Sequence, residues 1–197
     1  MSIMMDYVAS GIIFGILVIT IARIQVSINS TMYENTFSVR VQGNATQLAC
    51  QLEHDILKAG YGVSSGTAIS SADSTSLTFS AAMNNQGTPT TLTYQTGTKS
   101  QGTSTQNPDD FPLIRIEGGR QVTQNWGLIY FKFTYYDSAM IHILSTPVTG
   151  GNLAKIRAIQ ASIIIQSPEP VITAVDTSWP AVTWQKVMMP RNLGVIQ

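Results

Sequence analysis

The chain has 197 residues, of which only 11% are charged, and its net charge at pH 7 is zero. This length allows one membrane span and one domain of ordinary size, and the neutral charge offers no basic surface for nucleic acid. The single cysteine, Cys50, excludes an internal disulfide and a multi-cysteine metal site. Because Cys50 is near an apolar helical stripe, we expect a small buried side chain.

Residues 1–24 predict the transmembrane, filament-core half of a long helix. Residues 7–22 form an apolar run, preceded by Asp6 as the one charged side chain. A bilayer core of about 30 Å requires roughly 20 apolar residues, which this segment supplies. A removed signal peptide is the alternative, but it needs a basic start and a small-residue cleavage site. Neither is present around this run, so we favour a retained span.

Asp6, Gly11 and Gly15 are the candidate assembly residues. A carboxylate in hydrocarbon is costly unless it is paired, so Asp6 carries a functional hypothesis; the alternative is a solvated position at the membrane edge. Removal of Met1, which the small Ser2 favours, would make Asp6 the fifth residue. Gly11 and Gly15 form a small-xxx-small pair that permits close helix packing, although glycine is common in membrane helices.

Residues 25–60 predict an amphipathic continuation of the same helix. Apolar residues recur there at helical spacing: Val41, Ala45, Leu48, Ala49, Leu52, Ile56 and Leu57. Gly43 with Asn44 marks a weak point, and Gly60 is a natural helix stop. A helix over residues 4–59 would be roughly 80 Å long. Part of it must therefore project or pack against other copies.

Residues 61–197 predict a β-rich globular head. Strands 76–80 and 91–95 flank a turn-forming stretch and form a hairpin. Residues 96–110 are a polar, mobile surface loop. Further strands are expected at 111–116, 128–136, 140–144 and 154–165, before a segment bearing Pro and Trp. The fold class is α+β, with a long N-terminal membrane and stalk helix packed against an antiparallel sheet.

The order of these pieces carries a family resemblance. The pieces are the early acid and apolar helix, the stalk end at 52–62, the hairpin, and the segments 113–115, 131–135, 156–157 and 190–193. The chain resembles the type IV pilin-like family, and within it the minor pilins and pseudopilins of the PilW and J type. It departs from the family in having Asp6 where the early acid is usually Glu. The family's basic leader is not written ahead of the apolar run.

The resemblance implies a structural subunit. In that family, apolar helices pack into a central bundle and the early carboxylate, here Asp6, meets the N-terminal amine of a neighbour. Expected partners are other copies, other pilin-like subunits, membrane lipid before assembly, and an inner-membrane assembly platform with its ATPase. The expected location is the bacterial inner membrane, with the head outside the cytoplasm, or an extracellular filament.

No catalytic residue, metal site or cofactor is predicted. Glu53, His54 and Asp55 are adjacent on a helix, so their side chains point about 100° apart, and we expect a solvated face. Asp109, Asp110 and Asp137 lack the ligand spacing of a calcium loop. Two alternatives to the filament subunit stay open: a single-span accessory subunit that does not polymerise, and a membrane-anchored module whose loop 96–110 binds a surface ligand.

Overall fold

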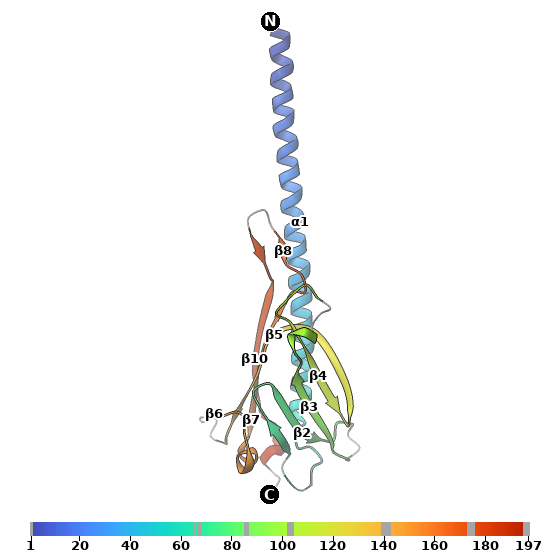
Figure 1. Cartoon of the computed structure of the whole chain (residues 1–197), viewed down its shortest axis with the longest axis vertical. Coiled ribbons are helices and arrows are strands. Elements are labelled where there is room, and N and C mark those ends of the chain that lie inside the picture. The colour runs from blue at the N-terminus through green and yellow to red at the C-terminus, as the bar shows by residue number, and fades with distance from the viewer. Residues whose placement is uncertain are drawn as a thin grey trace.

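A long apolar helix followed by a curled antiparallel sheet makes the chain an α+β protein, as the sequence predicts (Figure 1). The computed structural model describes residues 2–64, 66, 68–84, 87–101, 105–138, 143–172 and 176–194. Helix α1 runs without a break over Ser2–Leu57, which is 56 residues. Its first half projects from the head, and its second half lies against the sheet.

Helix α1 continues through the predicted weak point and ends where a glycine permits it. Gly43 and Asn44 are both helical, and the Asn44 amide Nδ2 donates a hydrogen bond to the Trp126 carbonyl oxygen at 3.2 Å. Gly60 has φ +82°, and its N–H donates to the Ser80 carbonyl at 2.9 Å. Glycine enters this left-handed conformation without a Cβ penalty, so the chain turns from the helix into the sheet there.

The main sheet has the order β1-β2-β3-β4-β5-β7-β10, with β6 also paired to β5. Its strands are β1 Ile69–Ala72, β2 Ser76–Ala81, β3 Thr90–Thr96, β4 Phe111–Glu117, β5 Arg120–Tyr136, β6 Ile143–Leu144, β7 Ala158–Gln166 and β10 Ala181–Met188. Strands β8 Val171–Ile172 and β9 Thr177–Ser178 form a separate two-stranded sheet. Three 3-10 helices complete the chain: η1 Lys99–Gln101, η2 Gly150–Lys155 and η3 Arg191–Gly194.

The predicted hairpin is confirmed as β2 and β3, but several strand boundaries were wrong. Strand β7 begins at Ala158 rather than residue 154, because residues 150–155 form η2. Strand β5 begins at Arg120, eight residues earlier than predicted, in a polar stretch that pairs with β4. Strands β1 and β10 were not predicted. Of the expected strand 140–144, residues 140–142 lie outside the described part of the chain.

Strand β5 joins the two halves of the sheet through a bend at Gly127. Its first part pairs with β4 and its second part with β7, with a register shift next to Leu128 in both pairings. Gly127 has φ +76°, and a Cβ built there would lie 2.5 Å from the Gln166 carbonyl oxygen. Only glycine fits this close approach, so Gly127 allows one long strand to serve both halves.

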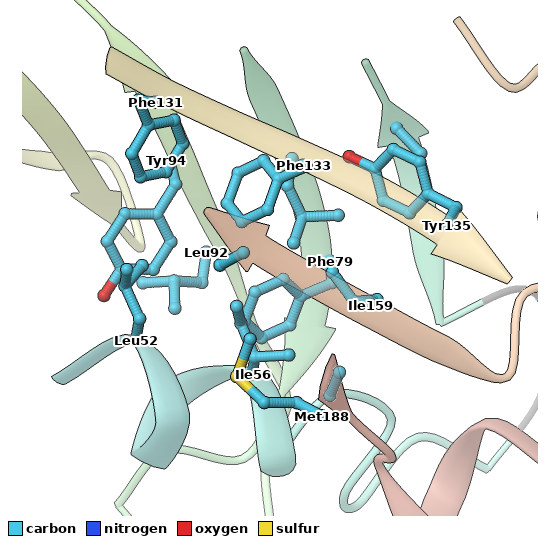
Figure 2. Packing of buried hydrophobic residues seen from close by; sticks show 14 of the residues in the cluster. Leu52, Ile56, Phe79, Leu92, Tyr94, Phe131, Phe133, Tyr135, Ile159 and Met188 are labelled. Carbon is cyan, nitrogen blue, oxygen red and sulfur yellow. The ribbon is translucent and has the colours of Figure 1, made fainter. Parts of the chain in front are cut away.

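The predicted apolar stripe of α1 is buried against the sheet, with one error. Leu52 and Ile56 are fully buried among Phe79, Phe133 and Met188 (Figure 2). Leu57, expected in the stripe, is 41% exposed. It points about 100° away from Ile56, and the helix ends there.

Cys50 is also exposed rather than buried. It lies about 100° around the helix from the buried Ala49, so its thiol lies beside the helix–sheet contact and not within it.

Candidate functional site

The projecting half of α1 is a long apolar surface that the rest of the described chain leaves uncovered. Exposed large apolar residues occur on all sides of this half: Ile3, Met4, Met5, Tyr7, Val8, Ile12, Ile13, Phe14, Ile16, Leu17, Val18, Ile19, Ile21, Ile24, Val26, Ile28, Met32 and Tyr33. By length and composition the helix can cross a membrane, and none of its most apolar stretch is buried against the rest of the chain. A helix that is apolar all round requires lipid or other helices around it.

The three predicted assembly residues lie in this projecting half and away from the head. Asp6 is exposed, and within the described part of the chain no salt bridge involves it. A Cβ added to Gly11 or Gly15 would meet nothing within 4 Å, so the chain's own packing does not require glycine at either position. At about 100° per residue, the two glycines lie roughly 40° apart and on the side opposite Asp6. The structure therefore separates the acid from the glycine pair.

The helix is fixed to the head by a buried ionic cluster, which the sequence prediction missed. Asp55 is 3% exposed, against the expected solvated face. Its Oδ2 accepts hydrogen bonds from the Tyr94 hydroxyl at 2.6 Å and from Arg115 Nε at 2.8 Å. Arg115 Nη1 also donates to Glu117 Oε2 at 2.7 Å, and His54 Nδ1 lies 3.1 Å from Asp55 Oδ1.

The sheet register explains why these side chains meet. Tyr94 on β3 and Arg115 on β4 are direct cross-strand partners, so both side chains lie on the same face of the sheet. Asp55 follows Leu52 by three helical positions and therefore lies beside the buried stripe. That spacing was a usable signal in the sequence. No local sequence pattern indicated that Asp55 pairs with Arg115, which is sixty positions away.

The cluster fixes the rotation of α1 about its own axis. A buried carboxylate is tolerated only where charged and polar partners surround it. Rotating the helix by one residue would remove Asp55 from both donors and bury a different side chain. Burial and the negative charge of Asp55 raise the pKa of Tyr94 far above its usual range, so its hydroxyl stays protonated and donates. The cluster thus sets the direction in which the projecting half leaves the head.

This raised pKa predicts a loss of stability at high pH. Burial also raises the pKa of Tyr135, with a contribution from the charge of Asp73. Both tyrosines keep their protons in the fold but lose them near pH 10 when unfolded. Their stabilisation is therefore present below about pH 10 and lost above it, at about 1.4 kcal/mol per pH unit for each.

Urea unfolding at pH 8, 10.5 and 11.5 measures this slope. In Tyr94→Phe the slope above pH 10 should be smaller than in the wild type by the contribution of one tyrosine. Equal slopes in the two proteins would contradict the assignment of Tyr94.

The acidic residues of loop 96–110 have partners within the chain. Asp109 forms a salt bridge with Lys99 at 2.6 Å, and Asp110 is buried and accepts a hydrogen bond from the Thr105 hydroxyl. Asn107 Nδ2 donates to the Ser167 carbonyl at 3.1 Å, which attaches the loop to the end of β7. Among the described residues, no group of three or more His, Cys, Asp or Glu side chains is arranged to hold a metal ion.

Helix α1 has two parts with different structural roles, the projecting apolar half and the half held by the Asp55 cluster. The second half is held in the head by the apolar stripe and by Asp55, and the first half is presented without a cover. Comparison with protein-family models, with curated proteins and with solved structures finds no match to this chain.

Proposed function

We propose that the chain is a structural subunit of a filament of the type IV pilus or pseudopilus kind. The observation that carries this proposal is the apolar first half of α1, whose most apolar stretch is not buried against any described part of the chain. Removing that surface from water requires lipid or the same helix of other copies. Bundling the helices of many copies would bury it on all sides, and it would leave the heads on the outside.

Asp6 would set the register of such a bundle. An unpaired carboxylate among apolar helices is expensive, whereas one that meets the N-terminal amine of a neighbouring copy is tolerable. A copy shifted along the bundle would leave both charges without partners. Gly11 and Gly15, on the opposite side, would allow a different neighbour to approach closely.

Before assembly the same helix would anchor the chain in a membrane. We place the subunit in the bacterial inner membrane with its head outside the cytoplasm. Its partners would be other pilin-like subunits, an assembly platform and an ATPase. The second candidate is a single-span accessory subunit that never polymerises. It is favoured by the length of the apolar run, which fits one bilayer crossing without any bundle.

Immunogold labelling of sheared extracellular material separates the two candidates. If the chain is a filament subunit, antibody to the head should label fibres in the electron microscope, along their length for a main subunit or at their tips for a minor one. Label confined to the cell membrane would contradict the filament and support the accessory subunit. Cells lacking the chain provide the control for the antibody.

A further inference from the structure

Strand β10 ends the main sheet with an open edge. It pairs with β7 over its whole length of eight residues without a register shift, and within the described part of the chain no strand pairs with its other side. The Ser167 N–H donates to the Pro180 carbonyl at 2.9 Å. This bond shows which residues of β10 direct their backbone groups to β7. In an antiparallel ladder the backbone groups alternate in direction. Those of Ala181, Thr183, Gln185 and Val187 therefore point to the open edge.

Proline, bulges and edge-directed charges, three of the usual protections of an edge strand, are missing from β10. Edges are normally blunted by proline, bulges, charged side chains or a covering segment. Strand β10 contains no proline, and the four residues directed to the edge are uncharged and exposed. Its one charged residue, Lys186, is turned toward α1, where Nζ lies 2.5 Å from Glu53 Oε1. The edge therefore offers unpaired backbone donors and acceptors with no charge to repel another strand.

A groove lies between this edge and α1. It has a volume of about 370 Å³, and its lining includes Ala45, Thr46, Ala49, Cys50, Val182 and Trp184. Six helical residues line it, and four of them (Ala45, Thr46, Ala49 and Cys50) are small, whereas Gln42 and Glu53 are longer. The small side chains leave space between α1 and β10. Val182 and Trp184 are only partly buried, and both pack against the core from the helix side. A strand added to β10 would direct every second side chain to this side.

We propose that β10 and this groove bind an extended segment of another polypeptide by β-strand addition. Backbone hydrogen bonds to Thr183, Gln185 and Val187 would give the affinity, and the groove would select a large apolar side chain. The segment would be uncharged where it faces the groove, because Glu53 and Lys186 already neutralise each other there. This binding does not depend on whether the chain polymerises.

A second copy of β10 does not fit this edge. Strand β10 runs alongside α1 (Figure 1). Antiparallel pairing of two β10 edges would invert one copy and point the two projecting helices in opposite directions, so they could not enter one membrane. Strand β1, at the other end of the sheet, has only four residues, and Ala72 is already bridged to Val148. We therefore assign the edge to a strand from a different polypeptide, and pairing with another part of a second copy is an outcome of the test below.

Peptide selection on the full chain in detergent tests the proposal. Random ten-residue peptides displayed on phage are selected on the immobilised protein. Enriched peptides should carry apolar residues at every second position and slow the amide exchange of Thr183, Gln185 and Val187. Gln185→Pro removes an edge N–H but no bond to β7, a placement that edge strands tolerate. It should weaken binding about tenfold, while Gln185→Thr should not.

A second variant keeps the test independent of the folding of Gln185→Pro. Cys50→Trp places a large side chain in the groove from an exposed position, and it should also weaken binding about tenfold, with Cys50→Ser as the control. Enrichment of no peptide, or equal binding to wild type, Gln185→Pro and Cys50→Trp, would overturn the proposal. Protection of the same amides by self-association, without peptide, would overturn it in favour of a second copy.

Discussion

Replacing Arg115 with methionine is expected to lower the free energy of unfolding of the head by about 3 kcal/mol. The variant keeps most of the volume of the side chain but leaves Asp55, which is 3% exposed, without its cationic partner. A buried carboxylate that loses its partner costs far more than an exposed salt bridge contributes. Urea unfolding of the full chain in detergent, followed by the near-ultraviolet signal of the head, measures the change.

Two further variants make this result specific to the buried cluster. Arg120 is the matched control, because it is exposed on the neighbouring strand, and Arg120→Met should change the unfolding free energy by less than about 0.5 kcal/mol. The double variant Arg115→Met with Asp55→Asn removes the unpaired charge and should recover part of the loss. If Arg115→Met and Arg120→Met have equal effects, Asp55 does not depend on Arg115 in the way described.

Replacing Asp6 with alanine is expected to abolish incorporation into filaments while leaving the stability of the head unchanged. Asp6 precedes the first fully buried residue of the stripe, Val41, by a helical distance of about 50 Å. Its loss therefore removes nothing from the core. In the proposed bundle, however, it leaves the N-terminal amine of the neighbour without its counter-charge. The measurement is the amount of the chain in the sheared filament fraction, next to the unfolding free energy of the purified protein.

Asp6→Glu is the matched control, since it keeps the charge and changes the reach of the side chain by one methylene group. It should retain most of the incorporation. Filaments that form normally with Asp6→Ala would show that Asp6 does not set the register. Loss of filaments together with a lowered unfolding free energy would instead assign the defect to folding.

The long helix, the β2–β3 hairpin and several further strands were predictable because each rests on a local pattern. Spacing of 3.6 residues identified the stripe from Val41 to Ile56, alternation identified β2 and β3, and aromatic and β-branched residues identified the second half of β5. The predictions failed where a local pattern was weak. The first half of β5 is polar and shows no strand signal. Strand β10 contains strand-favouring residues (Val182, Thr183, Trp184 and Val187), but it was read only as part of the last segment bearing Pro and Trp. Leu57 and Cys50 were placed by proximity to the stripe, without regard to the angle around the helix.

By itself, the sequence determined that α1 is one long helix, that its first half is predominantly apolar, and that Asp6 is the one charged residue between positions 1 and 22. These properties depend on neighbouring residues, and hydrophobicity and helical spacing are sufficient to produce them. Only the tertiary structure decided that Asp55 is buried with Tyr94 and Arg115, and that β10 is an open edge beside a groove. Both depend on which distant strands pair and in which register, and a sequence pattern of period two does not specify that choice.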